Sequence, residues 1–343
     1  AQTASTQAVE EMVGYRRINT PNEEDPLDAH IYELDNGLRV YLTENHEEPR
    51  FYAEIAVRAG SKHDPADATG LAHYLEHLLF KGNQNLGTLD YQAERPHLDR
   101  IVELYEEHFL ETDTARRAEI YAEINSEAQQ AAEYAVPNEI DKLYNGMGGT
   151  ALNAHTSYEE TVYKVGLPSN RLEQWAEIES NRFVNPVFRL FHTELETVYE
   201  EKNRTLDNSG RIIGTAVDEL MWKQHPYGQQ PTIGTVDHLK NPSLVYIRNY
   251  FDTYYVPNNM GIFMSGDIDS EATIALISEK FAHWKSKAVA DVGPWVEQPL
   301  QDAERRTVQY PGQEQVQIAF RTAANTSSEK EALIMVDMIL DNR

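Results

Sequence analysis

The chain has 343 residues, 41% of them hydrophobic, which is enough for one large domain with a buried core and part of another. Its 30 basic and 56 acidic side chains give a formal net charge of −26, which argues against binding nucleic acid or an anionic membrane, and no apolar run is long enough to span a bilayer. There is no cysteine, so a disulfide framework and thiolate metal sites are excluded.

Residues 1–30 are predicted to form a polar lead-in to the fold. The chain begins with Ala rather than Met, and Ala1–Glu10 is polar and typical of a loop. Two interpretations fit such a start: a mature end left by signal cleavage, or an artificial chain boundary. Together with the absence of cysteine, the first interpretation favours a periplasmic or secreted protein.

Three strands are predicted to follow the lead-in. Ile31–Leu34 and Leu38–Thr43 flank Asp35-Asn36-Gly37, whose composition is a strong hairpin turn signal. Tyr52–Arg58 is expected to be the third strand. This part of the chain therefore predicts the first strands of a sheet.

The segment Gly70–Leu79 is predicted to be a helix with a polar front and an apolar back. With His73 placed at 0° on a helical wheel, Glu76 lies at about −60° and His77 at about +40°. The back of the wheel is apolar, with Leu71, Tyr74, Leu75 and Leu78. Because residues i and i+4 share a helix face, His73 and His77 can bind one metal ion.

This pattern, His-x-x-Glu-His, is unusual enough to suggest catalysis. With 12 His and 56 acidic residues in the chain, chance predicts about 0.07 occurrences. Two imidazoles and one carboxylate form the three-ligand zinc site of hydrolases, whose fourth position holds a water that the ion acidifies. Glu76 is then expected to act as general base and proton shuttle rather than as a ligand.

The charged stretch between Pro96 and Pro137 is rich in Ala and Glu and lacks Gly. Apolar residues recur in it at helical spacing, first around Ile101 and Tyr105 and then around Ile120 and Ile124. We interpret residues 95–147 as an inserted helical hairpin with a turn near Thr112-Asp113. Three alternatives stay open for it: a cap over a cleft, a contact with a partner, or a solvated surface excursion.

An edge strand within Gly149–Thr156, a strand at Thr161–Val165 and a helix from Ser169 to Asn185, stopped by Pro186, are expected next. The helical segment Phe191–Asn203 then offers acids for a third metal ligand.

On the wheel of Phe191–Asn203, Glu194 and Glu201 flank the buried stripe, whereas Glu196 and Glu200 face solvent. Geometry alone leaves both Glu194 and Glu201 as candidates.

The rest of the first domain is predicted to contain two helices, a strand and a closing helix. The helices are Ile212–Trp222 and one that begins with Asn241-Pro242 as cap and first-turn proline. The strand is Met260–Ser265, and the closing helix is Ala272–Trp284.

Residues 289–301 are interpreted as a linker, and residues 302–343 as the start of a second, metal-less homologous domain. The predicted strands Val308–Tyr310 and Gln315–Arg321 and the helix Ser328–Leu340 repeat the order strand, strand, helix of the first domain, but without a His pair. Because the chain stops inside this repeat, we expect a truncated or partial polypeptide. The fold class predicted for the chain is α+β, a mixed, mainly antiparallel sheet packed by helices, with residues 31–288 as the zinc-binding catalytic domain.

Three segments resemble the amino-terminal catalytic half of the family of pitrilysin, insulin-degrading enzyme and the mitochondrial processing peptidases, which carry the inverted zinc motif. They are His73–His77, Gly149–Thr156 and Glu194–Glu201. The resemblance implies that His73, His77 and Glu201 bind one Zn²⁺, that Glu76 is the base and that Glu194 assists. It also implies that Asn153 and Ala154 contact substrate on an exposed strand edge. His77 and Glu201 are roughly fifty residues farther apart than is usual in the family, and the insertion accounts for the excess.

Two functions follow from this resemblance. The first is a zinc endopeptidase that cleaves peptides or small unfolded proteins, in which a zinc-bound water attacks with Glu76 as general base. The alternative is a non-catalytic scaffold or partner subunit of a two-part peptidase. In either case the expected partners are a peptide substrate and a missing carboxy-terminal half or partner subunit.

Overall fold

The computed structural model describes residues 14–20, 25–324 and 326–341. By its internal contacts the chain divides into two units, residues 1–204 with 230–294 and residues 205–229 with 295–343. The first unit holds the sheet and all the residues predicted for the metal site. Ala1–Glu10, predicted to be loop-like, lies outside the described residues. In the part of the chain that is described, no helix combines the length and apolarity needed to cross a membrane.

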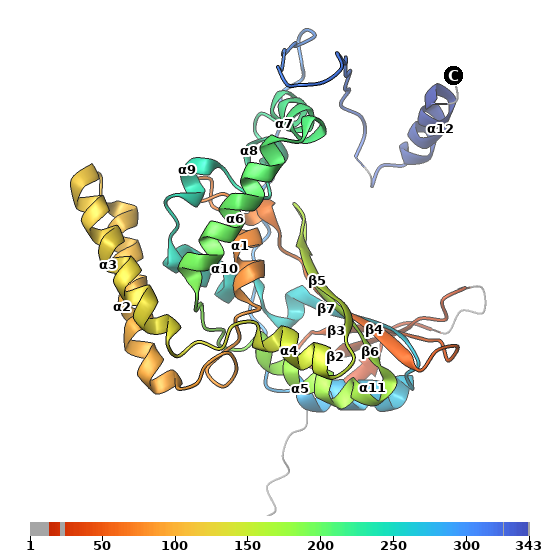
Figure 1. The fold of residues 1–343 in the computed structure, drawn as a ribbon. Coiled ribbons are helices and arrows are strands. Elements are labelled where there is room, and N and C mark those ends of the chain that lie inside the picture. Colours follow the sequence, from red (N-terminus) through yellow and green to blue (C-terminus); the bar gives the residue numbers. More distant parts are fainter. Residues whose placement is uncertain (1–13, 21–24, 325, 342–343) are drawn as a thin grey trace, which may run out of the picture. The chain divides into compact units, whose positions relative to one another are not determined.

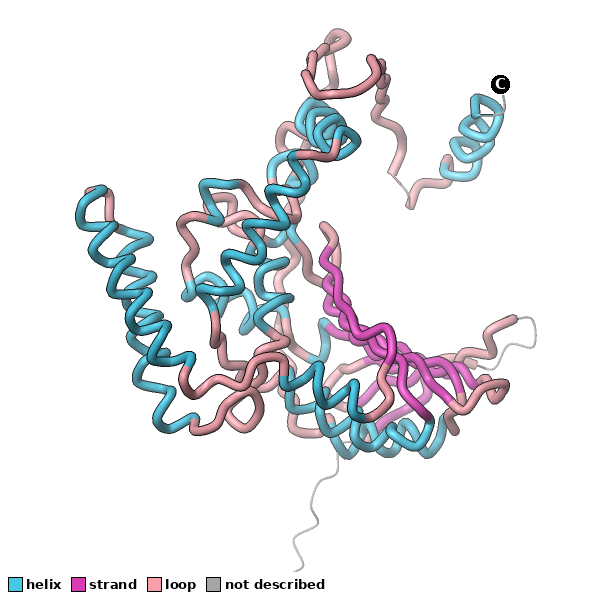
Figure 2. The backbone as a smooth tube through the Cα atoms, viewed as in Figure 1, coloured by secondary structure: helices cyan, strands magenta, loops and turns pink. Residues whose placement is uncertain are grey.

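The first unit is built on a mixed sheet, shown in magenta in Figure 2. Its described strands lie in the order β1-β2-β3-β7-β4-β6-β5, and β3 and β7 are the parallel neighbours in an otherwise antiparallel arrangement. This confirms the predicted α+β class. The strands are β1 (Tyr15–Arg17), β2 (His30–Leu34), β3 (Arg39–Glu44), β4 (Arg50–Val57), β5 (Thr150–Thr156), β6 (Thr161–Pro168) and β7 (Met260–Gly266).

The predicted hairpin turn joins β2 to β3, with Gly37 at φ 84°, a conformation that favours glycine. In β4, buried and less buried side chains alternate along the strand, as expected for a sheet with one face against the core. Strand β1 lies in the lead-in and was not predicted, because three residues are too few to show a period. It pairs with β2, where the ring of Tyr15 meets that of Tyr32 edge to face.

Helices α4 (Glu139–Gly146), α5 (Leu172–Arg182) and α11 (Ser270–Lys280) lie along one side of the sheet in Figure 1. Aromatic side chains fill the core between α5 and α11, where Trp175 packs against Phe281. Helix α5 follows a 3₁₀ turn, η2 (Ser169–Arg171), and is shorter than predicted. Helix α11 begins two residues earlier than predicted because the Asp269 carboxylate accepts a hydrogen bond from Ala272 N.

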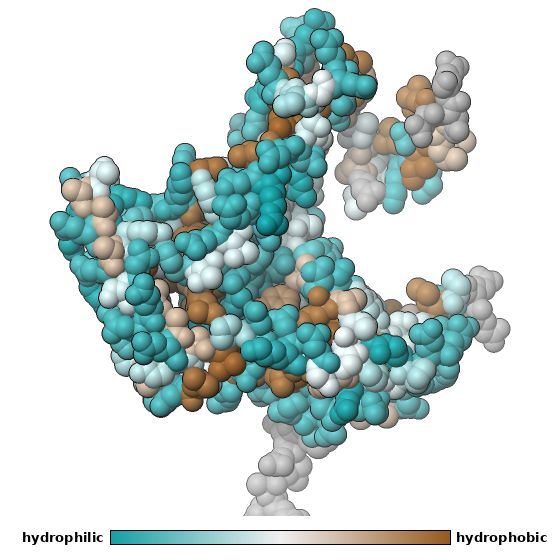
Figure 3. All heavy atoms as spheres, in the orientation of Figure 1, coloured by the Kyte–Doolittle hydropathy of each residue, from teal (hydrophilic) through white to brown (hydrophobic). Residues whose placement is uncertain are grey.

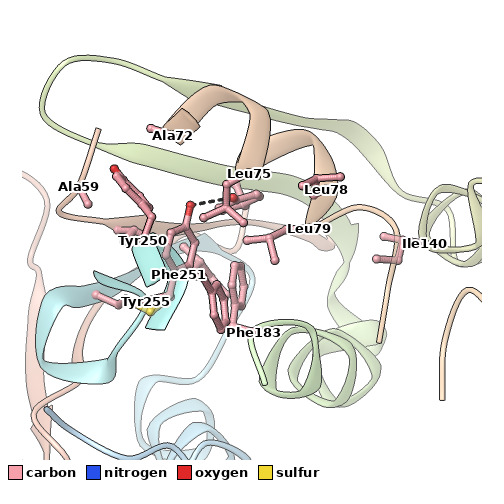
Figure 4. Packing of buried hydrophobic residues seen from close by; sticks show 14 of the residues in the cluster. Ala59, Ala72, Leu75, Leu78, Leu79, Ile140, Phe183, Tyr250, Phe251 and Tyr255 are labelled. Atoms are coloured by element: carbon pink, nitrogen blue, oxygen red, sulfur yellow. Dashed lines mark hydrogen bonds between the residues drawn. The ribbon is translucent and has the colours of Figure 1, made fainter. Parts of the chain in front are cut away.

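Helix α1 (Leu71–Leu78) is the segment predicted to carry the metal ligands, and it follows a 3₁₀ turn, η1 (Ser61–His63). Its apolar back enters the core as the wheel predicts. Figure 4 shows Leu75 and Leu79 in the cluster that also contains Phe183 and Phe251. Burying this back leaves the His/Glu front for chemistry.

Two buried side chains, Asp64 and Arg182, bind backbone groups at the two ends of α1. The Asp64 carboxylate, 4% exposed, accepts hydrogen bonds from Gly70 N at 2.8 Å and Ala72 N at 2.9 Å. At the other end Arg182 Nε donates to Leu79 O at 3.1 Å, and Arg182 Nη1 pairs with Glu179. Helix termini expose unpaired N–H and C=O groups, and these two residues satisfy some of them inside the core.

The predicted helical hairpin is formed by α2 (Tyr91–Leu110) and α3 (Thr114–Ala132), which pack side by side. Its first helix begins four residues before the predicted boundary at 95, and α4, inside the predicted range 95–147, contacts β5 instead. The turn lies at residues 111–113, and the Asp113 carboxylate accepts from Arg116 N at 2.8 Å. The pair buries Ile101, Leu104, Ile120 and Ile124, whereas its outer face in Figure 3 is largely hydrophilic.

Helix α10 (Leu244–Tyr254) begins later than predicted. Its N-cap is Ser243, whose Oγ accepts from Tyr246 N at 3.1 Å. Asn241, predicted as the cap, instead accepts a hydrogen bond from Arg117 of α3 through Oδ1. The other elements of this unit are α6 (Phe191–Leu206, whose last two residues fall in the second unit), α9 (Val236–Leu239) and η3 (Pro257–Asn259).

The second unit contains α7 (Ser209–Met221), α8 (Pro226–Gln229) and α12 (Lys330–Asp341). The prediction of strands at Val308–Tyr310 and Gln315–Arg321 is wrong, since neither segment is a strand. A strand needs a neighbour for its backbone hydrogen bonds, and the described residues give these segments none. Val316 and Phe320 are accordingly 90% and 81% exposed. The predicted domain boundaries stay predictions.

We predict that Asp64→Asn destabilises the fold by about 1–3 kcal/mol, because an amide N–H would face the backbone N–H groups at the start of α1. Urea unfolding measures the change. Asp67→Asn is the matched control, since Asp67 is exposed and its replacement should change the free energy of unfolding by less than about 0.5 kcal/mol. Equal effects of the two substitutions would contradict the role of Asp64.

Candidate metal centre

Three predicted ligand atoms converge between α1 and α6. Glu201 Oε2 lies 3.5 Å from His73 Nε2 and 3.7 Å from His77 Nε2. A tetrahedral zinc ion with ligand bonds of about 2.1 Å separates its ligand atoms by about 3.4 Å. The donor set of two imidazoles and one carboxylate and its spacing therefore fit zinc. Within the described residues, His73, His77 and Glu201 are the cluster of His, Asp and Glu side chains whose ligand atoms lie close enough together to bind one metal ion.

The second candidate acid, Glu194, lies outside this group. Its Oε2 is 3.4 Å from His77 Nδ1, and its Oε1 is 2.6 Å from Lys81 Nζ. Carboxylates that bind the far nitrogen of a ligating histidine fix its tautomer and ring orientation. The structure thus distinguishes the two acids that the helical wheel left equivalent. Glu201 faces the Nε2 atoms of both histidines, whereas Glu194 contacts the opposite ring nitrogen of His77, Nδ1.

The two histidines differ in their second nitrogen. His77 Nδ1 faces Glu194, whereas the buried Nδ1 of His73 has no hydrogen-bond partner among the described residues. Burial, together with the charge of His77, lowers the pKa of His73 to about 4. For His77 burial acts in the same direction, but the hydrogen bond to Glu194 and the charges of Glu201 and Glu76 outweigh it and raise the pKa.

Glu76 lies on the same helix but points to the sheet. Its side chain is buried, 6% exposed, and its Oε2 accepts a hydrogen bond from Thr156 Oγ1 of β5 at 2.6 Å. Burial raises the pKa of Glu76, while the bond from Thr156 and the charge of His77 oppose the rise. A carboxylate whose pKa is raised toward neutrality can both accept and return a proton.

Asn153 and Ala154 lie on β5, the last strand of the sheet order. Asn153 is paired with Lys164 and Ala154 with Tyr163 of β6. Within the described residues, the other edge of β5 has no strand beside it. This edge can accept an extended peptide, but the assignment of Asn153 and Ala154 to substrate binding stays a prediction.

Sequence reasoning missed Thr156 and Lys81 as members of the site. Thr156 belongs to the segment Asn153–Thr156, which was considered only as a strand edge. Ala154 and Thr156 are two positions apart on the strand, so both side chains lie on the same face, the one toward the core. This two-residue period was the signal in the sequence that could have identified Thr156. Lys81 lies beyond the end of α1, and its partner Glu194 lies on α6. Helical spacing relates only residues of one helix, so it could not connect these two.

Two family models match the chain. The model described as insulinase (peptidase family M16) matches residues 39–95 and 128–235, and the model described as the peptidase M16 inactive domain matches residues 244–342. The first match omits residues 96–127, which are most of α2 and α3.

Curated relatives and solved structures agree with these models. A probable zinc protease PqqL of Haemophilus influenzae is 26% identical over 77% of this chain and 24% of its own length. The zinc protease PqqE of Helicobacter pylori is 25% identical over 80% of this chain and 52% of its own length. The chain therefore spans about a quarter to a half of these relatives.

The crystal structure of the first half of the periplasmic protease PqqL from Escherichia coli superposes with a TM-score of 0.57, at 22% identity, over 78% of this chain and 48% of that one. That likeness concerns the fold. Taken with the matched family models and the zinc proteases among its relatives, it shows that this chain belongs to the insulinase family of peptidases, also called the pitrilysin or M16 family.

Proposed function

We propose that the chain is the zinc-dependent part of an endopeptidase that cleaves peptides or small unfolded proteins. The observation that carries this proposal is the convergence of His73 Nε2, His77 Nε2 and Glu201 Oε2. The zinc proteases among its relatives support it.

Each side chain then has a role that follows from its place. His73, His77 and Glu201 would hold one zinc ion, which when bound polarises the peptide carbonyl and acidifies water. Glu76 accepts the proton of the attacking water and returns it to the leaving amine. Thr156 keeps the Glu76 carboxylate in position, and Glu194 keeps the His77 ring in position.

The substrate would add to the free edge of β5 as an extended strand, with Asn153 and Ala154 beside it. Because the chain spans about a quarter to a half of its relatives, we propose that a carboxy-terminal half or a partner subunit completes the peptidase. The periplasmic protease among the similar structures supports an exported location for this chain as well.

The second candidate is a non-catalytic partner subunit. It is favoured by the match of residues 244–342 to a model described as an inactive domain. The two candidates differ in whether the metal site performs chemistry, so variants of that site separate them.

Replacement of the proposed carboxylate ligand tests the site itself. We expect Glu201→Gln to lose bound zinc, because a neutral amide is a poor zinc ligand. The neighbouring exposed Glu200→Gln should retain about one ion per chain. Elemental analysis of the dialysed proteins measures both. Equal zinc contents in the two variants would remove Glu201 from the site.

Replacement of the proposed base tests the chemistry. With the carboxy-terminal half supplied in trans, Glu76→Gln should keep its zinc and lose about 10²–10⁴-fold in peptide cleavage. A fluorogenic peptide library measures the rate. Cleavage that persists in this variant would refute the role of Glu76. If the parent binds zinc and still cleaves nothing with its other half present, the partner-subunit function is correct instead.

Replacement of the supporting acid tests the role of Glu194. Glu194→Gln should weaken zinc binding by about 10–100-fold without abolishing it, because the neutral amide oxygen is a weaker acceptor for His77 Nδ1 than the carboxylate is. It should also lower the pKa of His77 in the metal-free protein, measurable by NMR titration. Unchanged affinity together with an unchanged pKa would show that the contact has no function in the site.

A further inference from the structure

The inserted helices α2 and α3 contact the start of α6, the helix that carries Glu194 and Glu201. Most of this insertion, residues 96–127, lies outside the match to the family model. Arg117 of α3 also binds Asn241, and Ser243 binds Glu106 of α2. The insertion is therefore fixed to the body of the first unit on two sides.

His192, in the first turn of α6, is held by one phenol from each inserted helix. Tyr105 Oη of α2 lies 3.0 Å from His192 Nδ1, and Tyr121 Oη of α3 lies 3.5 Å from His192 Nε2. Tyr105 is 1% exposed. Engaging both imidazole nitrogens fixes the orientation of the ring, which a single hydrogen bond would leave free to rotate.

The preceding residue, Phe191, joins the insertion to α1. Its ring lies 4.7 Å from that of Tyr105 of α2 and 4.7 Å from that of Tyr74 of α1, measured between centroids. Tyr74 Oη also donates to Phe191 O at 2.5 Å. The first turn of α6 is thus attached to α1, which carries the two histidines, and to the insertion.

The entry into α6 needs such support. Leu190 has φ 54°, a left-handed conformation that costs a non-glycine residue energy unless its surroundings enforce it. A cavity of about 180 Å³ lies here, lined by residues of α2, α3 and 188–193. Just before Leu190, the buried guanidinium of Arg189 pairs with Glu94 of α2 at 3.0 Å. Within α6 itself, Phe191 and His192 make ring and hydrogen-bond contacts with α2 and α3.

We propose that the inserted hairpin braces the ligand-bearing helix, with Tyr105 and His192 as positioning residues for Glu194 and Glu201. Glu194 follows His192 by two positions on a rigid helix, so a shift of the first turn moves its carboxylate relative to His77. This inference rests on the proposed zinc site and adds to it a support from residues outside the match to the family model.

The test compares phenylalanine variants that each remove one hydroxyl. Tyr105→Phe should weaken zinc affinity by about 2- to 30-fold, the range expected for a residue coupled to a site through contacts. Tyr134→Phe is the matched control, because Tyr134 stacks on His97 at the end of the insertion, and it should leave the affinity unchanged. Competition with a chelator measures affinity, and the visible spectrum of the Co²⁺-substituted protein reports ligand geometry.

A double-mutant cycle separates positioning from general destabilisation. In a His192→Ala background, Tyr105→Phe should cause no further loss of zinc affinity, because the contact it removes is already gone. Thermal unfolding of the metal-free variants shows whether both still fold. Three results would contradict this positioning role. They are additive losses of zinc affinity in the double variant, an unchanged Co²⁺ spectrum with unchanged affinity in Tyr105→Phe, and a loss of affinity in Tyr134→Phe equal to that in Tyr105→Phe. A parent protein that binds no zinc would instead refute the proposed function.

Discussion

The candidate metal centre depends on the fixation of α1. A helix of eight residues is too short to be stable alone, so its position must come from its surroundings. Its apolar back packs into the core, Asp64 binds backbone N–H groups at its start, and Arg182 binds the carbonyl of Leu79 at its end. With both ends and one face fixed, the rings of His73 and His77 have little freedom left.

Helix α6 carries the second half of the centre. It meets α1 and the residues just after it through Phe191 against Tyr74, through Glu194 against His77 and Lys81, and through Glu201 against both histidines. Between Glu194 and Glu201, the side chains of Leu195 and Val198 are buried in the core cluster. The place of the Glu201 carboxylate therefore depends both on the contacts at the start of α6 and on packing along the helix.

Much of the fold and part of the site could be predicted from sequence because they follow local periods. The helical period placed His73, Glu76 and His77 on one face, and the turn chemistry around Gly37 gave the first hairpin. The helical period alone could not choose between Glu194 and Glu201, since both flank the same stripe. The family resemblance made that choice, and the contacts of the two acids with the histidines agree with it. Arg182 binds Leu79, 103 residues away in the sequence, and Asp64 binds backbone N–H groups six to eight residues ahead across an irregular turn, so no period reveals either contact. The strands predicted around Val308 and Phe320 are wrong although their local sequence pattern is typical of strands. No described strand lies beside them to pair with their backbone, and a local pattern does not reveal whether such a neighbour exists.

The electrostatics of the centre connect these parts. Three carboxylates, Glu76, Glu194 and Glu201, lie around two imidazoles in a chain whose net charge is −26. Lys81 offsets Glu194, whereas the charge of Glu201 adds to the burial that raises the pKa of Glu76. A divalent cation among His73, His77 and Glu201 would reverse this influence, because it attracts the charge of Glu76 where Glu201 alone repels it. The bond from Thr156 favours the ionised carboxylate in both cases. Metal binding and the proton affinity of Glu76 are therefore linked, because the residues of the metal site, Glu201 and His77, also act on the charge of Glu76.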